Sequence, residues 1–484
     1  MQASQVKIEY GDFQTPPELT EKICQKLWQI HVNPDVIIEP TCGIGNFLKA
    51  ASLTFKETEK ILGFEINPNY ITQINQDRQI SQDQRIQVEQ KNFFDCDWYS
   101  LTQPWTENIL FLGNLPWITN SKQGLINGKN LPQKSNFQGY HGLDAMTGRS
   151  NFDISEWMLI KLIECLDRRS AYLAIICKTA VSRKILNYIY TQKINLTYSA
   201  IYPINTQKYF QANVDACLLF CQFDSQSENY FCDVFNSFEE GEFQRIGYQN
   251  NILVRDLNTF IRLEKLYHRH PLVEKWRSGI KHDCSKVMEL QLVNGIFVNG
   301  LKEIVDIETT YLYPLLKGSD VAQNRLEIIN KYVLVTQKFI GESTENMRDI
   351  APKTWQYLVN HVDYFGNRKS KIYQNQPDFS IFGVGSYTFS PFKIAISGLY
   401  KKLNFQLISP YQNQPVIFDD TVYFLSFDDL DTAQKTLQLL NSSLAMEFYS
   451  SLIFWDEKRP IKTRILNSLN LSELGCITNA NAAK

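Results

Sequence analysis

The sequence predicts an α/β fold in which parallel strands alternate with helices that cover both faces of the sheet. Four short apolar runs lie early in the chain, and segments with apolar residues at helical spacing alternate with them. We expect this pattern to occupy residues 1–245 and a mixed α+β domain to occupy residues 246–484. The carboxyl ends of parallel strands share one edge of a sheet, so the polar residues that follow the strands are expected to meet there.

The composition limits the classes of protein to which the chain can belong. With 484 residues and 44% hydrophobic content, it is long enough for two or three domains with substantial cores. The net charge of -2 excludes a uniformly basic nucleic-acid binder but leaves local basic patches possible. The amino terminus lacks an apolar signal core, the apolar runs are shorter than the ~20 residues that span a bilayer, and the cysteines form no Cys-x-x-Cys pair. We therefore expect a cytoplasmic protein with reduced thiols and no contact with a membrane.

One group of residues invites a metal-site interpretation. His268, His270, His282 and Cys284 recur at short spacings, but zinc ligands usually show tighter pairs. Ordinary loop and core positions explain the four residues better, and we expect no metal.

The first two strands and their turns resemble a nucleotide-binding arrangement. A helix from Thr20 to Trp28 precedes the strand Val36–Glu39, and the turn after this strand contains Gly43 and Gly45 and leads into a helix at Leu48–Leu53. Glycines let the backbone approach a ligand, and the amino end of a helix offers free N–H groups. Glu65 ends the next strand about 20 residues on, where a carboxylate can accept the hydroxyls of a ribose. The alternative for Glu65 is a helix-capping acid ahead of Asn67.

The third and fourth strands add further polar groups to this edge. Ile86–Glu89 leads to Asn92–Asp95, and Ile109–Leu112 leads to the segment 114–117, Asn-Leu-Pro-Trp. This segment brings an amide oxygen, a backbone carbonyl and a flat aromatic surface close together. The expected elements that follow are a helix at Ile154–Leu166, a strand at Ala171–Cys177, a helix at Val181–Tyr190 and a strand at Val214–Phe223.

The order of these motifs resembles a known family. Phe-Gln-Thr-Pro-Pro at 13–17, Glu-Pro-Thr-Cys-Gly-Ile-Gly at 39–45, Gly-Phe-Glu-Ile at 63–66, Asn-Phe-Phe at 92–94 and Asn-Leu-Pro-Trp at 114–117 look like the adenine-specific (N6) DNA methyltransferases of bacterial restriction–modification systems, gamma class. The resemblance implies a Rossmann-like class I methyltransferase sheet, a target-recognition domain after it, and S-adenosylmethionine as the cofactor. The cofactor-binding positions that it implies are Thr15, Glu39, Thr41, Gly43, Gly45, Glu65, Ile66, Asn92 and Phe93.

The same resemblance assigns the methyl-transfer site to Asn114, Leu115, Pro116 and Trp117. The Asn114 side-chain oxygen and the Leu115 carbonyl would bind both protons of the adenine amino group and localise the nitrogen lone pair, so that no acid, base or metal is required. Leu115 stands where the family usually has proline, which gives up a fixed φ, and Trp117 stands where it usually has tyrosine. A duplex adenine reaches such a site only when it is turned out of the helix, and Trp117 would then stack on it.

Tyr209 and Phe210 match the second aromatic position of the family, and Phe210 is the favoured one. The alternative is that both residues simply pack before the following strand. Four basic residues of the stretch 120–150 are candidates for closing over the nucleotide, although a solvated insertion explains them equally well: Lys122, Lys129, Lys134 and Arg149.

The expected partner is double-stranded DNA, read by the domain that begins near residue 246. This part carries basic and aromatic clusters at 281–282, 368–371, 400–402 and 458–464, which suit phosphate and base contacts. We find no nuclease or Walker motif, so a cognate restriction endonuclease would be a separate chain, and we expect a monomer. Three alternatives remain: transfer to adenine in ribosomal RNA, transfer to a protein glutamine, and a non-catalytic DNA-binding subunit. Cytosine amino methylation shares the chemistry.

Overall fold

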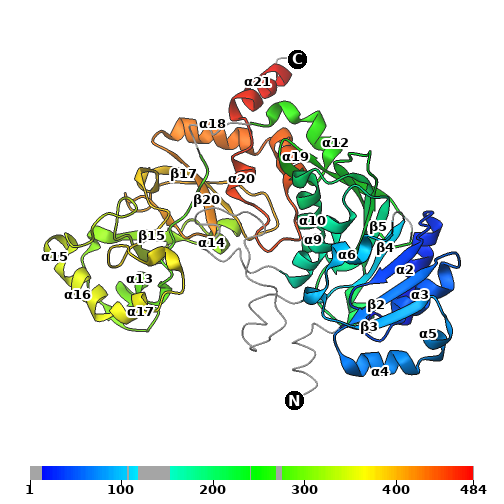
Figure 1. Ribbon diagram of the computed structural model, residues 1–484. Coiled ribbons are helices and arrows are strands. Elements are labelled where there is room, and N and C mark those ends of the chain that lie inside the picture. Colours follow the sequence, from blue (N-terminus) through cyan, green and yellow to red (C-terminus); the bar gives the residue numbers. More distant parts are fainter. Residues whose placement is uncertain (1–12, 106–107, 118–152, 240, 269–274, 483–484) are drawn as a thin grey trace. The chain divides into compact units, whose positions relative to one another are not determined.

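The protein forms two compact units, Met1–Leu257 and Asn258–Lys484. The computed structural model describes residues 13–105, 108–117, 153–239, 241–268 and 275–482 (Figure 1). Residue 245, where the sequence places the domain boundary, lies within strand β9 (Phe243–Gln249).

The first unit alternates strands and helices in the described residues. Its elements before strand β5 are α2 (Pro17–Gln29), β1 (Val36–Glu39), α3 (Asn46–Thr54), β2 (Lys60–Glu65), α4 (Pro68–Gln76), α5 (Arg78–Gln82), β3 (Ile86–Gln90), η1 (Phe93–Asp95), α6 (Trp98–Thr102), β4 (Ile109–Asn114) and α9 (Ile154–Leu166). Those that follow are β5 (Ala171–Lys178), α10 (Thr179–Gln192), β6 (Leu196–Ile204), α11 (Thr206–Phe210), β7 (Ala216–Phe223), β8 (Phe231–Phe235), β9 and β10 (Ile252–Val254).

These strands form one sheet in the order β10-β9-β8-β6-β7-β5-β4-β1-β2-β3. Strands β1 to β5 are mutually parallel, which places the carboxyl ends of β1, β2 and β4 at one edge, as predicted. Strand β7, by contrast, runs antiparallel to both β5 and β6. Strand β6 was not predicted. The mixed α/β class is confirmed, with a sheet that is parallel around the site and mixed beyond it.

Helices cover both faces of this sheet. Helices α2 and α3 pack on one face, where Leu19, Ile23 and Phe47 join Ile37 and Leu110 in a common apolar core. Successive side chains of a strand point to opposite faces of the sheet, so the strand residues next to Ile37 and Leu110 point toward the helices on the other face. Figure 1 shows α9 and α10 on the side of the sheet opposite α2 and α3. Both helices contact β5 there.

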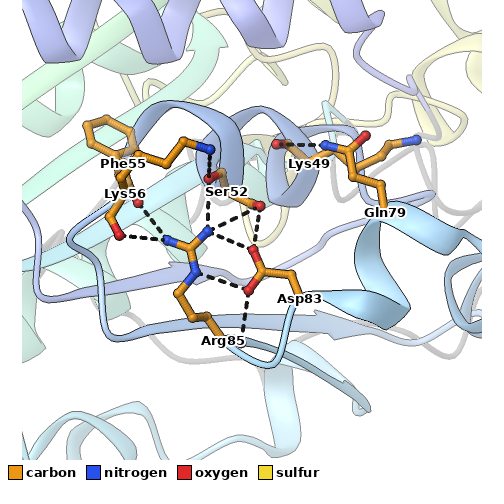
Figure 2. Close-up of polar contacts among 7 residues, drawn as sticks. All are labelled: Lys49, Ser52, Phe55, Lys56, Gln79, Asp83 and Arg85. Atoms are coloured by element: carbon orange, nitrogen blue, oxygen red, sulfur yellow. Dashed lines mark hydrogen bonds and ion pairs between the residues drawn. The ribbon is translucent and has the colours of Figure 1, made fainter.

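The carboxyl end of α3 is held by a guanidinium group. Arg85 Nη1 donates to the carbonyl of Phe55 at 2.9 Å, and Nη2 donates to the carbonyl of Ser52 at 2.9 Å (Figure 2). Asp83 accepts from Arg85 Nε at 3.0 Å and orients the guanidinium. The hydrogen bond from Arg85 lowers the pKa of Asp83 far below its ordinary value. Helix-terminal carbonyls lack partners within the helix, so the Arg85 side chain fixes the carboxyl end of α3.

The second unit is a mixed α+β structure. Its strands form a four-stranded sheet in the order β11-β20-β17-β18 and a six-stranded sheet in the order β14-β13-β12-β16-β15-β19. The unit has two apolar cores, one around Val333 and Leu358 and one around Phe418 and Phe424, and both sheets contribute to the second. The strands are β11 (Arg277–Ser278), β12 (Glu289–Val293), β13 (Ile296–Asn299), β14 (Ile304–Val305), β15 (Leu312–Leu316), β16 (Lys331–Leu334), β17 (Phe392–Ser397), β18 (Gln406–Ile408), β19 (Ile417–Phe418) and β20 (Val422–Phe427).

Short helices connect these strands, and longer ones follow them. The helices are α12 (Leu257–Arg262), which begins at the last residue of the first unit, η2 (Glu264–Leu266), α13 (Ser285–Met288), η3 (Thr309–Tyr311), α14 (Gly318–Ala322), α15 (Met347–Ile350), α16 (Pro352–Asn360), α17 (Val362–Gly366), η4 (Lys371–Tyr373), η5 (Ser386–Phe389), α18 (Leu430–Leu440), α19 (Ser443–Leu452), α20 (Thr463–Leu466) and α21 (Leu471–Ala482). Among the described residues, no helix has the length and apolar character needed to cross a lipid bilayer.

Candidate active site

A cavity lies at the edge of the sheet where β1, β2 and β4 end. The empty space at this site, counted together with the open solvent at its mouth, is about 1020 Å³. Most of the positions named from the sequence line it: Thr15, Glu39, Thr41, Gly43, Glu65, Ile66, Asn92, Phe93, Asn114, Leu115 and Pro116.

Four of the named positions do not belong to the cavity wall, namely Gly45, Trp117, Tyr209 and Phe210. Gly45 is the residue before α3 and has a left-handed φ of 79°. A Cβ atom there would lie 2.7 Å from Ile80 Cδ1, so the glycine permits both the turn and its packing. Its effect on a ligand is therefore indirect, through the shape of the turn.

The turn after β1 is held by residues from two other segments. The Gly43 N–H donates to Glu65 Oε2 at 2.8 Å, and the Ile44 N–H donates to Gln14 Oε1 at 3.0 Å. Asn46 Nδ2 donates to the Thr15 carbonyl at 2.8 Å. Gly43 has φ +54°, and a Cβ atom at this position would lie 2.3 Å from Gln14 Oε1. The sequence motif around Gly43 thus depends on Gln14, a contact that the sequence did not reveal.

Glu65 is fixed at the end of β2 by main-chain donors. Its Oε1 accepts from the Asn67 N–H at 2.8 Å, in addition to the bond that Oε2 accepts from Gly43. Asn67 itself caps α4, since its side chain accepts from the Asn69 N–H. The carboxylate is held in one position on the cavity wall.

Glu39 is the buried acid of the cavity. It is 3% exposed, and its Oε2 has no hydrogen-bond partner among the described residues. Burial, together with the negative charge of nearby Glu65, raises the pKa of Glu39 well above its ordinary value. An unpaired buried carboxyl oxygen is costly to keep, which indicates a position that a ligand or water completes.

Asn92 and Phe93 form the wall on the β3 side. The Asn92 side-chain oxygen accepts from the Phe94 N–H at 3.2 Å and caps the 3₁₀ turn η1. The Phe93 ring packs on Trp98 with centroids 4.7 Å apart. The amide oxygen of Asn92 therefore already has a local partner and offers a ligand only its second lone pair.

The orientation of the Asn114 amide is determined by its partners. Its Nδ2 donates to the Phe13 carbonyl at 3.1 Å and to Thr15 Oγ1 at 3.2 Å. A carbonyl can only accept, so the nitrogen must face Phe13 and the oxygen must face away from it. This Oδ1 is buried and has no partner among the described residues. The main-chain carbonyl of Asn114 accepts from Thr41 Oγ1 at 3.3 Å.

Three aromatic side chains pack together behind Asn114. The Trp117 and Phe210 rings lie 5.2 Å apart at 69°, and Phe13 lies 5.5 Å from Trp117 and 6.2 Å from Phe210. Trp117 is 7% exposed and Phe210 is 8% exposed, and both belong to the core on the α2–α3 side. A base would need these rings to separate before it could stack between them. Tyr209 is half-buried beside Lys208, whose Nζ lies 4.6 Å from the ring centroid.

Several other residues named from the sequence lie away from the cavity wall. Arg368 donates to the Ser380 carbonyl at 2.7 Å and lies 3.7 Å from the centroid of Tyr373, so it stabilises its own unit. His282 is buried and accepts from the Cys284 N–H. Within the described ranges, no three His, Cys, Asp or Glu residues are grouped as metal ligands. His270 and the four basic residues of the stretch 120–150 lie outside those ranges.

Comparisons with known proteins place this site in context. No protein-family model matches the chain. The type II methyltransferase M.NspV of Nostoc sp. (strain ATCC 29411 / PCC 7524) is 62% identical over 468 residues, 97% of each protein. Among solved structures, the type IIL restriction–modification enzyme MmeI, determined in complex with DNA, is similar with a TM-score of 0.54 and 12% identity, over 96% of this chain and 68% of its own. A type I restriction–modification methyltransferase subunit from Streptococcus thermophilus is similar with a TM-score of 0.32 and 13% identity, over 53% of each chain.

These relationships differ in what they show. The similarity to MmeI, at 12% identity, concerns the fold, and it extends over both units. The relationship to M.NspV, at 62% identity, covers almost the whole of both proteins. The chain therefore belongs to the type II methyltransferases, the DNA methyltransferases of restriction–modification systems.

Proposed function

We propose that the protein transfers a methyl group from S-adenosylmethionine to the N6 amino group of adenine in duplex DNA, as the modification component of a restriction–modification system. The observation that carries this proposal is the unpaired Asn114 Oδ1 at the wall of the cavity. This oxygen is an uncharged acceptor, and the two hydrogen bonds that the amide nitrogen of Asn114 donates hold it in place. Such an acceptor suits an amino group that must keep its lone pair available for reaction.

The cavity wall fits the cofactor that the proposal requires. Glu65 would hold the ribose hydroxyls, the Gly43 turn would approach the ligand closely, and the unpaired Glu39 oxygen offers an additional polar contact. Bound S-adenosylmethionine supplies an electrophilic methyl group. The protein's part is to bind and orient the amino group and to exclude water.

The two acceptors proposed for the amino group are adjacent in sequence. Asn114 Oδ1 would accept one proton, and the carbonyl of Leu115 would accept the other. The side chain of Leu115 is 1% exposed, so it is anchored in the apolar interior beside the cavity. The aromatic side chains Trp117 and Phe210 would stack on the extruded base once they separate.

The second unit would recognise the target sequence. It exposes Lys369, Lys371, Lys401, Lys402 and Lys458 on its surface. Lysines contribute to DNA affinity through counterion release, so replacing Lys401 and Lys402 with Gln should weaken duplex binding and lower the slope of log K against log salt by about 0.9 for each lost phosphate contact. A measured slope equal to that of the wild-type protein would remove these residues from the DNA-binding surface.

The proposal is tested by methyl transfer with labelled cofactor. We expect label in duplex DNA, recovered as N6-methyladenine after digestion and mass spectrometry. Recovery as N4-methylcytosine would correct the target base, and label only in RNA or protein would overturn the DNA substrate. Asn114→Ala should reduce transfer by at least about 100-fold while cofactor affinity stays within a few-fold. Asn187→Ala, on the exposed face of α10, is the matched control and should leave transfer unchanged.

The remaining parts of the proposal concern partners. We propose that a separately encoded endonuclease cleaves the same sequence and that methylation protects the host. Resistance of the methylated DNA to that nuclease would support this role. We also propose a monomer in solution, and light scattering that gives the mass of a dimer would contradict it.

A further inference from the structure

We propose that Lys178 is a positioning residue for methyl transfer, because its ammonium group joins the end of the segment 114–117 to the helix that lines the cavity. The inference rests on the proposed function. Lys178 Nζ donates to the main-chain carbonyl of Trp117 at 3.3 Å. The same Nζ lies 2.5 Å from Asp153 Oδ2. Neither Lys178 nor Asp153 was among the positions identified from the sequence.

The location of Lys178 follows from the register of the sheet. Asn114, the last residue of β4, is paired with Ile176 of β5. Strand β5 continues to Lys178, so its last side chain stands beside the chain that leaves β4. This places the ammonium group next to the main chain of the methyl-transfer segment without making it part of the cavity wall.

Asp153 has a second role that fixes it in place. Its Oδ1 accepts from the Ser155 N–H at 3.2 Å and from Ser155 Oγ at 2.6 Å, which caps α9. The other oxygen receives Lys178. Asp153 is 7% exposed, so the ion pair is held away from most of the water that would screen it. Helix α9 in turn places Ile154 and Met158 on the cavity wall.

The segment 114–117 is thus held at both ends. At its start, Asn114 is bound by Phe13, Thr15 and Thr41, and at its end the Trp117 carbonyl is bound by Lys178. Between these ends, Leu115 lacks the fixed φ that a proline would supply. Lys178 therefore determines where the Leu115 carbonyl and the Trp117 ring stand relative to Asn114 Oδ1.

The test compares kcat with the binding constants. Lys178→Met keeps the length of the side chain and removes both polar contacts. We expect kcat to fall by about 10–100-fold, since displacements of about 1 Å have effects of this size. The KM for the cofactor and its dissociation constant from calorimetry should stay within about twofold, because Lys178 does not line the cavity. Lys178→Arg, which retains the charge and the donors, should recover most of the lost kcat.

A second readout and a control separate positioning from stability. Hydrogen exchange should become faster at the amides of Leu115 and Trp117 in Lys178→Met and stay unchanged at the centre of α9. Lys184→Met breaks another ion pair to α9, that with Glu156, without touching the segment 114–117, and its kcat per folded molecule should equal that of the wild type.

Two results would overturn the inference. One is a Lys178→Met kcat within twofold of the wild type. The other is a loss of kcat that parallels the loss of folded protein equally in Lys178→Met and Lys184→Met. Either result would leave the proposed function standing. The proposed function itself fails if the wild-type protein transfers no methyl group to DNA.

Discussion

The ring of Phe13 lies 5.5 Å from the indole of Trp117, with 34° between the two planes. The same residue binds Asn114 through its carbonyl. Because the side chain and the main chain of Phe13 make these contacts separately, a substitution can remove one and keep the other. Phe13→Ala should lower the free energy of unfolding by roughly 1–3 kcal/mol through lost apolar burial. Urea denaturation measures this change, and a loss below about 0.5 kcal/mol would show that the ring contributes little.

Thr15 supports the amide of Asn114 through its hydroxyl. Thr15→Val removes the acceptor at 3.2 Å and keeps the shape of the side chain. One hydrogen bond is worth about 0.5–1.5 kcal/mol, so kcat should fall by roughly 2–15-fold. Thr15→Ser keeps the hydroxyl and should retain nearly full activity. Equal rates for the Val and Ser variants would indicate that the Phe13 carbonyl alone orients the amide.

Glu39 should make stability depend on pH. Burial raises its pKa above the ordinary value of 4.5, so the unfolded chain loses the proton at lower pH than the folded protein does. The contribution of Glu39 to stability is therefore fully present below pH 4.5 and declines as the pH rises toward the folded pKa. The Glu39→Gln side chain cannot ionise. The melting temperature of this variant minus that of the wild type should therefore increase between pH 5 and pH 8. The exposed Glu57→Gln is the control, and a constant difference for Glu39→Gln across this range would contradict the prediction.

Lys393 should make the stability of the second unit depend on pH. It is 1% exposed, and its Nζ donates to the Val416 carbonyl at 2.7 Å. Burial lowers the pKa of Lys393 from 10.5 to about 7. The unfolded chain therefore binds more protons than the folded protein between about pH 7 and pH 10.5, and wild-type stability rises through this range.

Lys393→Met removes this dependence. Its melting temperature should exceed that of the wild type most strongly at or below pH 7, by roughly 3–8 °C, and the difference should shrink toward pH 10. The exposed Lys401→Met should show no such trend. A difference that grows with pH would have the wrong sign and would place the charged form of Lys393 in the folded protein throughout.

Helices and strands were predicted best from the sequence where a capping residue and the pattern of apolar residues indicate the same element. Helix α9 has the predicted bounds, because a capping Asp153 precedes an almost continuously buried run. Strand β6 was missed because its run contains Pro203. The antiparallel direction of β7 could not be read, since a fully apolar run indicates burial and carries no information about direction.

The same limits apply to the candidate site. The residues that gather around the cavity do so because they follow parallel strands, and Glu39, Glu65 and Asn114 share that edge for this reason. Gln14 and Lys178 were missed because each acts on residues far away in the sequence, at Ile44 and Trp117. No local pattern records such pairs. The burial of Trp117 against Phe13 depends on packing in the same way.

The separation into two units has a consequence for redesign. Every residue that lines the cavity lies between Phe13 and Met158, whereas the units divide after Leu257. On the proposed division of roles, a chimaera that keeps residues 1–257 and takes its remainder from a relative with another recognition sequence would methylate the sequence of that relative. The junction at 257–258 is thus the place where we propose to exchange target specificity.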